Sequence, residues 1–408
     1  MVESPAGTMA SPGRSVPKPR IALVCDLAEE KWPSMDLVAD MLFRYLPQDA
    51  SNGTVTRLCP PLRKRLGRLP SPRPTLFHNA DRLLNRFVDY PRWLRERTHE
   101  FDLFHVIDHS YSQLVHDLPA GRSVVTCHDL DTFRCLLDPE REARPRWFRA
   151  MTARILSGFQ KAAHVIAVSA ATRDDILQRG LLPAERVTVV PNGVHPSCSP
   201  LPDPDADAEL AGLLPSGSEN SIWLLNVGST MPRKRLDLLL RVVAEVLKRA
   251  PNVRLLRVGG PLTPAQAALA KELGVAQAVV ELPSLNRAVL AAAYRRADVL
   301  LHTAEAEGFG LPVIEALACG CPVIASDLAV LREVGGAAVA YCGIGDMEAW
   351  KNTVLGVIEK SPQGAVPFRF DRERAIAQAG RFSFLENARL TSRIYENILR
   401  KALWQNEL

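Results

Sequence analysis

The segment at residues 305–326, EAEGFGLPVIEALACGCPVIAS, constrains the fold of this chain more than any other. Gly308 and Gly310 tolerate positive φ angles and disfavour helix, so the adjacent Glu307 is expected on an exposed loop. Pro312 suits the first turn of a helix, because a proline lacks the N–H that would have no partner there. The sequence therefore predicts a loop that leads directly into a helix.

The helix after this loop is expected to end at about Cys319, since Gly320 is typical of the left-handed residue that follows a helix. The next run, PVIA at 322–325, is short and apolar, which favours a buried strand. A loop, a helix and a buried strand in this order indicate one unit of an α/β fold.

A helix N-terminus preceded by glycines is a suitable anion site. Its first N–H groups are unpaired and the glycines let a ligand approach the backbone, which favours phosphate. Glu315, in the first helical turn, can interact with the helix dipole or accept hydrogen bonds from the hydroxyls of a ribose or sugar. The alternative is that Glu315 only stabilises the helix dipole and that Glu307 is a solvated loop residue.

Apolar strands alternate with helices along the chain, and 408 residues are enough for two domains of ordinary size. We expect strands at 21–25, 55–59, 103–107, 123–127, 186–190, 223–227, 253–258, 278–282, 297–301 and 322–325, and a strand plus a helix capped by Ser169 at 164–180. Further helices are expected at 36–45, 79–97 with an interruption near Pro91, 264–273, 287–296, 346–359 and 384–403. The predicted fold class is α/β, with two doubly wound sheets.

Composition suggests the domain boundaries. We predict a disordered tail at 1–19, an N-terminal domain at 20–200, a proline-rich linker at 201–219, a C-terminal domain at 220–383 and a final helical segment at 384–408.

Two histidines follow strands of the predicted N-terminal sheet. His109 comes after 103–107, and His128 comes directly after 123–127. Ligands of open parallel sheets bind beyond the carboxyl ends of strands, which places both histidines at a candidate site. A structural role is the alternative for either of them.

A cluster of cations follows the first strand of the C-terminal domain. The loop that starts at Gly228 carries Arg233, Lys234 and Arg235, and Leu236 begins a helical period. Backbone N–H groups and positive side chains in this order are typical of a diphosphate site. The alternative is a group of solvated basic residues.

Three motifs together carry a family resemblance. EGFGLPVIEALACGCPVIAS at 307–326, VGSTMPRK at 227–234 and TCHDL at 126–130 resemble the donor-binding signature of the GT-B retaining glycosyltransferases of family 4. The resemblance covers nearly the whole chain after residue 20. It implies the GT-B fold, in which two Rossmann-like domains face a central cleft and the last helix packs back on the N-terminal domain.

The resemblance also implies roles for individual residues. Arg233 and Lys234 would neutralise the leaving diphosphate, Glu315 would hold the ribose, Glu307 the sugar hydroxyls, and His128 the far side of the donor sugar. The other donor-binding residues would be Gly228, Gly308, Phe309, Gly310, Leu311, Leu282 and Ser284.

The implied reaction is retaining transfer of a hexose, of mannose or glucose type, from a nucleoside diphosphate sugar to a hydroxyl acceptor. The donor would be a GDP- or UDP-sugar and no metal would be required. The acceptor would be a saccharide or a lipid-linked acceptor in cell-surface polysaccharide or glycolipid synthesis. A sugar-nucleotide epimerase, a phosphorylase and a non-catalytic sugar-nucleotide-binding scaffold are the alternatives.

The first loop departs from the family pattern. Many members have a glycine pair near the donor diphosphate, whereas this chain has Glu29 to Ser34, EEKWPS. The departure makes Trp32 a candidate for the acceptor side, and His109 is a second candidate there. An ordinary surface loop is the alternative.

Charge and cysteine usage suggest the location. Residues 51–100 hold 11 basic and four acidic residues, which fits contact with an anionic membrane surface or simply a solvated surface. The eight cysteines lack zinc spacing, and residues 1–19 lack the apolar core of a signal peptide. We therefore expect a cytoplasmic protein without nucleic-acid partners, with peripheral contact at the inner face of the membrane as a further hypothesis.

Overall fold

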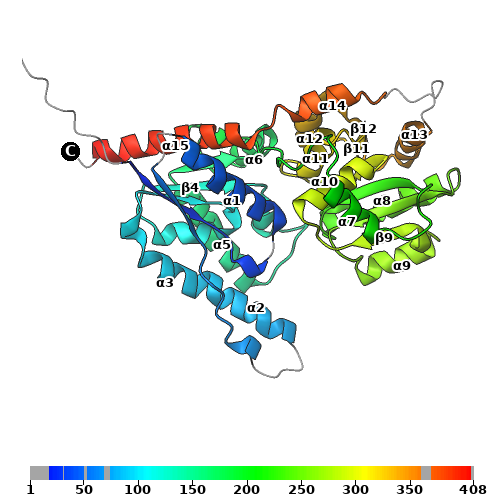
Figure 1. Ribbon diagram of the computed structural model, residues 1–408. Helices are drawn as coiled ribbons and strands as arrows, with labels where there is room; N and C mark the ends of the chain where they lie inside the picture. Colours follow the sequence, from blue (N-terminus) through cyan, green and yellow to red (C-terminus); the bar gives the residue numbers. More distant parts are fainter. Residues whose placement is uncertain (1–17, 31, 50–52, 69–73, 360–368, 406–408) are drawn as a thin grey trace, which may run out of the picture.

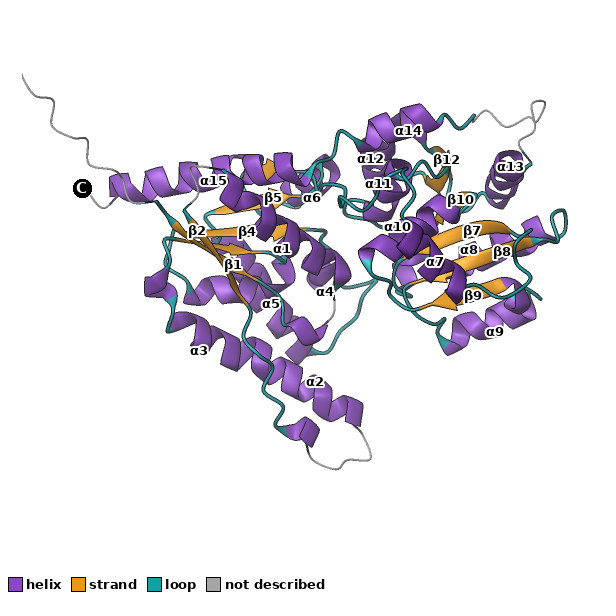
Figure 2. Cartoon of the chain, in the orientation of Figure 1, coloured by secondary structure: helices purple, strands orange, loops and turns teal. Residues whose placement is uncertain are grey.

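The computed structural model describes residues 18–30, 32–49, 53–68, 74–359 and 369–405. In these residues the chain forms two six-stranded parallel sheets, each with helices on its faces, and the sheets lie in separate halves of the molecule (Figures 1 and 2). The predicted α/β class with two doubly wound, Rossmann-like domains is confirmed. Most of the predicted tail at 1–19 lies outside the described residues.

The first sheet has the strand order β2-β1-β3-β4-β5-β6. Its strands are β1 (Arg20–Val24), β2 (Thr54–Leu58), β3 (Leu103–Val106), β4 (Ser123–Cys127), β5 (His164–Ala167) and β6 (Val187–Val189). The chain leaves β1 toward β2 on one side and then returns to β3 on the other. Such a switch point leaves a crevice at the carboxyl ends of the strands where ligands bind.

The second sheet repeats this plan with the order β12-β11-β10-β7-β8-β9. Its strands are β7 (Ile222–Val227), β8 (Val253–Val258), β9 (Val279–Leu282), β10 (Val299–His302), β11 (Val323–Ser326) and β12 (Ala340–Cys342). Here the connections diverge between β7 and β10, so the second domain has a switch point of its own.

The helices connect and cover these strands. They are α1 (Pro33–Tyr45), α2 (Pro74–Leu84), α3 (Tyr90–Arg95), α4 (Arg134–Leu137), α5 (Arg146–Lys161), α6 (Ala170–Gln178), α7 (Pro204–Leu213), α8 (Leu236–Leu247), α9 (Pro264–Glu272), α10 (Arg287–Arg296), α11 (Leu311–Ala318), α12 (Ala329–Gly335), α13 (Met347–Ile358), α14 (Arg372–Ala379) and α15 (Phe384–Gln405).

Strand β1 shows why its sequence is apolar without interruption. Ile21 and Leu23 share a buried cluster with Leu37 of α1, on one face of the sheet. Ala22 and Val24 belong to the cluster on the other face. Successive side chains of a strand point to opposite faces, and both faces of β1 are covered, so residues 21–24 are all apolar.

The last helix, α15, returns from the second domain and lies along the first one (Figure 1). Phe384 and Tyr395 belong to the same buried cluster as the residues of α1. The Tyr395 hydroxyl lies 2.6 Å from Nδ1 of His105, a residue of β3. The return path passes close to Gly193, where an added Cβ would lie 2.1 Å from the backbone nitrogen of Phe384, so glycine is required there.

The helix expected at 79–97 has the interruption that was predicted near Pro91, but its bounds differ. It begins at Pro74, and a π-helical turn at Asn85–Asp89 interrupts it before Pro91. Pro91 has no N–H to continue the regular hydrogen-bond ladder, and the wider turn ahead of it accommodates this gap.

The predicted linker at 201–219 contains a helix, α7. Asp203 caps it by accepting a hydrogen bond from the N–H of Ala206, and Pro204 occupies its first turn. Ala206 and Leu210 are buried where α7 packs on α10. The prolines suggested irregular chain, but a proline in the first turn is compatible with a helix.

None of the helices in the described part of the chain is both long enough and apolar enough to cross a bilayer.

Candidate active site

A cavity of about 650 Å³ lies between the two domains, beyond the carboxyl ends of their strands. His128, directly after β4, and Gly228, directly after β7, both line it. The predicted site residues that line it are Trp32, His128, Gly228, Arg233, Lys234, Ser284, Glu307, Gly308, Phe309, Gly310, Leu311 and Glu315. Leu282 and His109 are absent from the lining.

Helix α11 points its N-terminus into the cavity, as the sequence indicated. Gly310 precedes the helix with φ = 92°, and an added Cβ would lie 2.7 Å from Cδ2 of Leu331. Pro312 occupies the first turn, and Gly320 follows the helix with φ = 73°. Because the first N–H groups of a helix have no intrahelical partner, the N–H of Leu311 is available to an anion.

Lys234 and Glu307 form an ion pair in the wall of the cavity. Lys234 Nζ lies 2.5 Å from Oε2 of Glu307, and Nε2 of His302 lies 3.1 Å from the same oxygen. The side chains of Lys234 and Glu307 are 15% and 13% exposed. The sequence reasoning did not single out His302, although it ends β10 as a polar residue after an apolar run, which was an available signal.

The protonation states of this group follow from its surroundings. Burial alone would raise the pKa of Glu307, but Lys234, His302 and Arg233 together hold it well below the usual value. Burial lowers the pKa of His302. Lys234 lowers it further, whereas the Glu307 carboxylate raises it and only partly offsets these effects. At neutral pH the site therefore contains an ionised Glu307 and a neutral His302 that donates through Nε2.

Arg233 connects the two domains. Its guanidinium donates to the carbonyl of Ala306 at 3.1 Å and lies 3.4 Å from Asp129 and 3.6 Å from Asp131, both in the first domain. A donor diphosphate placed here would contact Arg233 and the N-terminus of α11, both of the second domain.

A strained residue orients these cations. Arg235 has φ = 48°, the one positive φ among the non-glycine residues of the described chain. The hydroxyl of Thr303 donates to the carbonyls of Lys234 (3.0 Å) and Arg235 (3.3 Å), and the N–H of Glu305 donates to the carbonyl of Arg233 at 2.8 Å. Such strain persists only when surrounding contacts hold it, and it concentrates at functional sites.

Glu315 is 2% exposed and keeps one oxygen free of hydrogen bonds. Tyr294 donates to Oε2 at 2.9 Å, whereas Oε1 has an arginine, Arg287, at 3.5 Å and no hydrogen-bond partner in the described residues. Burial raises the pKa of Glu315, partly opposed by Arg287 and Tyr294. A buried acceptor without a donor is costly, so Oε1 is suited to a ligand hydroxyl.

Arg287 is a second residue that the sequence reasoning missed. It donates to the carbonyl of Pro33 across the cavity at 2.7 Å, in addition to facing Glu315. The sequence did contain an indication. A cation in the first turn of a helix interacts unfavourably with the helix dipole, which suggests that Arg287 is there to bind an anion or a carbonyl group.

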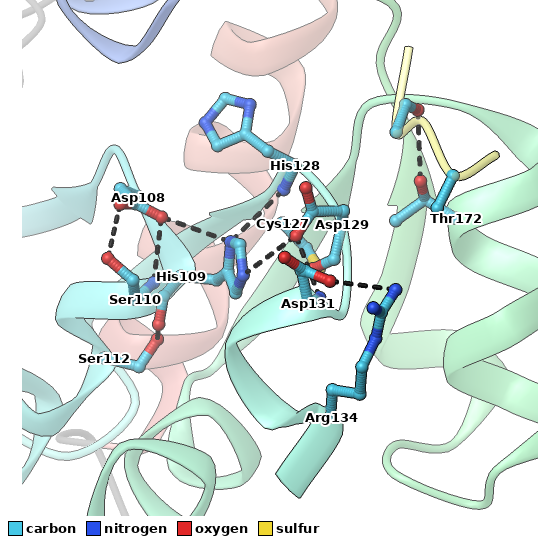
Figure 3. A network of polar contacts seen from close by, with 12 residues as sticks. Asp108, His109, Ser110, Ser112, Cys127, His128, Asp129, Asp131, Arg134 and Thr172 are labelled. Carbon is cyan, nitrogen blue, oxygen red and sulfur yellow. Dashed lines mark hydrogen bonds and ion pairs between the residues drawn. The ribbon is translucent and has the colours of Figure 1, made fainter. Parts of the chain in front are cut away.

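His128 and His109 have different surroundings. Nε2 of His128 lies 2.9 Å from the carbonyl of Ile107, and burial lowers the pKa of this histidine. In Figure 3 its ring stands apart from a network in which His109 lies between Asp108 (3.2 Å) and Asp129 (3.7 Å). His128 lines the cavity.

His109, predicted as an acceptor-side candidate, is not among the residues that line the cavity. His109 is 4% exposed. Burial lowers its pKa, but Asp108 and Asp129 raise it above the usual value. Its place is thus an internal polar network behind the cavity wall.

Leu282 is likewise outside the cavity. Its side chain belongs to the apolar core of the second domain, and its carbonyl accepts hydrogen bonds from Gly259 (3.2 Å) and Gly260 (3.1 Å). Ser284, two residues further on, lines the cavity. The end of β9 thus supports the neighbouring glycine loop and does not line the cavity.

The glycine-poor first loop ends in another helix N-terminus. Trp32 is 44% exposed and lines the cavity, and Pro33 opens α1. Ser34 and Met35 follow it along the cavity wall. The cavity therefore has helix N-termini on both sides, α1 from the first domain and α11 from the second.

A second cavity, of about 800 Å³, adjoins the first, and Asp129, Arg233 and Glu307 line both. Each arginine that lines it faces a carboxylate: Arg134 with Asp131, Arg141 with Asp138, Arg179 with Asp175, and Arg233 with Asp129. This space is therefore polar, but its guanidinium groups are already paired. In the part of the chain that the structure describes, no three His, Cys, Asp or Glu side chains gather as a metal site.

Family comparisons match each domain separately. Residues 216–376 match the family described as "Glycosyl transferases group 1", and residues 41–197 match "Glycosyltransferase Family 4". The two matches together take in the residues that line both walls of the first cavity, apart from those of the first loop.

Curated relatives share part of the sequence. A D-inositol 3-phosphate glycosyltransferase of Mycolicibacterium smegmatis is 38% identical over 147 residues, which is 33% of this chain and 32% of the relative. D-inositol 3-phosphate glycosyltransferase 2 of Catenulispora acidiphila is 33% identical over 240 residues, 55% of this chain and 54% of the relative. The chain thus spans about a third to a half of the length of the curated relatives it matches.

Solved structures share the whole fold. Sucrose-phosphate synthase of Thermosynechococcus elongatus superposes with a TM-score of 0.68 at 21% identity, over 94% of this chain and 100% of the other. Anabaena Alr3699/HepE in complex with UDP-glucose gives 0.68 at 19% identity, over 93% and 100%. These similarities show the GT-B fold.

Proposed function

The chain belongs to the GT-B glycosyltransferases of family 4, with one family match in each domain, and from this premise we propose that it is a retaining glycosyltransferase. It transfers a hexose from a nucleoside diphosphate sugar to a hydroxyl of an acceptor. The observation that carries the proposal is a single cavity in which a helix N-terminus, two cations and an ionised carboxylate meet.

The diphosphate end of the donor lies at α11 and at the cations of the loop after β7. Lys234, Arg233 and the N–H groups at 308–311 stabilise the negative charge that develops on the leaving group. Each well-placed donor of this kind lowers a reaction barrier by ~3 kcal/mol. Lys234 faces Glu307 in the structure described here, so the arriving diphosphate would share that cation with the carboxylate.

The nucleoside end lies at Glu315. Its free Oε1 accepts from a ribose hydroxyl, and Ser284 lies along the base side of the cavity. HepE is described in complex with UDP and UDP-glucose, which supports a UDP-sugar as donor here, and a GDP-sugar is the second candidate.

The sugar lies between the domains, with Glu307 and His128 on its two sides. Ionised Glu307 accepts hydrogen bonds from sugar hydroxyls. No enzyme group attacks the sugar: the acceptor oxygen approaches C1 on the face that the diphosphate leaves. The bond from C1 to the diphosphate oxygen breaks, the bond to the acceptor oxygen forms, and the acceptor proton passes to the departing diphosphate.

The acceptor enters through the second cavity, which meets the first at Glu307. Seven acidic residues and four arginines line this cavity, so its side chains can exchange hydrogen bonds with hydroxyls, whereas the excess of carboxylates would repel a phosphate group. We therefore favour an unphosphorylated saccharide group, free or lipid-linked, although the curated relatives are named for inositol 3-phosphate.

Contact with an anionic membrane at residues 51–100 remains part of the proposal. Arg63, Lys64 and Arg92 are exposed there. Leu76 of α2, 57% exposed, adds an apolar group. A lipid-linked acceptor would make such contact useful.

The first test offers UDP-, GDP-, ADP- and dTDP-sugars to the purified protein and measures release of the nucleoside diphosphate. We expect release with one base, and a loss on the order of 100-fold for Lys234→Ala, since a diphosphate donor is removed. Lys248→Ala is the matched control, because Lys248 is 67% exposed and pairs only with Glu245 among the described residues. Equal rates for Lys234→Ala and wild type would contradict the assignment of the clamp, and silence with all donors would favour a binding scaffold.

A further inference from the structure

The N-terminus of α6, in the first domain, holds the loop that carries Glu307. Ser169 caps α6, and its hydroxyl lies 2.8 Å from the carbonyl oxygen of Gly308. The hydroxyl of Thr172 lies 3.2 Å from the same oxygen. Thr172 is labelled in Figure 3. Both side chains are buried, at 0% and 6% exposure for the whole residues. One carbonyl of the second domain thus accepts from two hydroxyls of the first.

Gly308 is pressed against the first domain at this point. A Cβ added to it would lie 1.6 Å from the carbonyl oxygen of His128. No side chain fits there, so Gly308, the neighbour of Glu307, touches the backbone of His128. In the proposed function, His128 faces the donor sugar from the side opposite Glu307. The relative position of Glu307 and His128 therefore depends on this contact.

A third residue joins the same helix end from the second domain. The Glu333 carboxylate of α12 accepts hydrogen bonds from the N–H groups of Ala170 (2.9 Å) and Ala171 (3.3 Å). These N–H groups are the first of a nine-residue helix and have no intrahelical partners. A carboxylate at a helix N-terminus is also favoured by the helix dipole.

We propose that Ser169, Thr172 and Glu333 are positioning residues of the transfer reaction. The hydroxyls of Ser169 and Thr172 and the N–H groups of Ala170 and Ala171 form what we call the α6 socket, which receives the carbonyl of Gly308 and the carboxylate of Glu333. Every one of these contacts joins the two domains, so the socket is filled only when the domains are closed. This inference rests on the proposed function, because it assigns the socket the task of setting Glu307 against His128 and excluding water from the donor.

The test compares variants that empty the socket by different routes. Thr172→Val keeps the shape and removes one hydroxyl, Thr172→Ser restores it, and Glu333→Ala removes the carboxylate without touching the cap of α6. Glu373→Ala is the control, because Glu373 is an exposed acidic residue of α14 in the same domain.

We expect Thr172→Val and Glu333→Ala each to lower kcat for transfer by roughly tenfold, and to raise the ratio of donor hydrolysis to transfer. Binding of UDP or GDP alone should change less than twofold, since the second domain supplies most of that site, and Thr172→Ser should recover the kcat. A merely structural role would lower the amount of folded enzyme without changing the hydrolysis ratio. Unchanged kcat and ratio in both variants would overturn the proposal.

Solution scattering gives a second readout that needs no catalysis. The wild type should scatter as the closed form, while Glu333→Ala should show a larger radius of gyration and Glu373→Ala should not. If the wild type turns over no nucleotide sugar, the proposed function fails. The scattering measurement still tests whether the α6 socket holds the two domains together. An unchanged radius in Glu333→Ala would then count against it.

Discussion

At the scale of single residues, the two glutamates of the 305–326 segment have opposite electrostatic settings eight positions apart. The pKa of Glu307 is held well below its usual value, because Lys234, His302 and Arg233 outweigh the effect of its burial. The pKa of Glu315 is raised by burial, which Arg287 and Tyr294 only partly offset. The ionised form of Glu307 is therefore stabilised by its surroundings, whereas burial destabilises the ionised form of Glu315 until a ligand donates a hydrogen bond to it.

This difference predicts the behaviour of Glu315→Gln. A carboxyl whose folded pKa is raised binds protons more tightly in the folded state, so its contribution to stability falls as the pH rises above the ordinary pKa. The neutral variant should therefore have a higher Tm than the wild type at pH 7 to 8 without ligand. The gain should shrink as the pH is lowered toward 4, where the wild-type carboxyl is also neutral.

The same variant should bind the donor less well. We expect its KM for the donor sugar to rise about tenfold, since a charged hydrogen bond to the ribose is lost. Thermal scans across this pH range, together with donor titrations, check both parts. A variant less stable than the wild type at pH 8 would show that Arg287 and Tyr294 outweigh burial.

At the scale of elements, the approach to α11 depends on one backbone angle. Gly310 has φ = 92°, and an added Cβ would lie 2.7 Å from Leu331. Gly310→Ala should therefore destabilise the protein by ~2 kcal/mol or more, from left-handed strain and from the contact. It should also weaken donor binding, because the N-terminus of α11 would move.

Gly212→Ala is the matched control for that element. Gly212 lies in α7, has no positive φ, and an added Cβ would meet nothing within 4 Å. Alanine should stabilise this helix by ~0.5–1 kcal/mol. Equal Tm values and equal donor affinities for the two variants would refute the role given to the turn at Gly310.

At the scale of the whole molecule, α15 ties the end of the chain to the first domain. His105, fully buried in β3, has Thr126 Oγ1 at 2.7 Å on one ring nitrogen and the Tyr395 hydroxyl at 2.6 Å on the other. Burial lowers the pKa of His105 to about 3, so the ring is neutral and needs one donor and one acceptor partner.

Tyr395→Phe should therefore cost ~1–3 kcal/mol in the free energy of unfolding, because a buried ring nitrogen loses its partner. Denaturant unfolding measures this cost. Arg389→Ala, at a side chain that is 59% exposed on the same helix, should change stability by less than ~0.5 kcal/mol. A loss for Tyr395→Phe no larger than that of the control would mean that the last helix is held by its apolar contacts alone.

Local patterns were sufficient for most of the strands and for the turn that begins α11, but not for helices such as α5, α7, α12 and α14, which were not predicted. Strands 123–127 and 253–258 are rich in Val, Leu and Cys, and both were predicted with the bounds that the structure has. The turn at Gly308 to Pro312 and the stop at Gly320 follow from what glycine and proline allow. These features depend only on residues that are neighbours in the chain, so a single sequence is enough to predict them.

Only the tertiary structure decided which side chains share a site. Trp32 and Ser284 line the cavity, whereas His109 and Leu282 do not, because the path of the chain after a strand decides whether a side chain faces the cavity or the interior. Arg287 reaches Pro33 across 254 positions, and Thr172 reaches Gly308 across 136. Such contacts depend on how the two domains pack against each other, and a local sequence pattern cannot predict which distant residues this packing brings together.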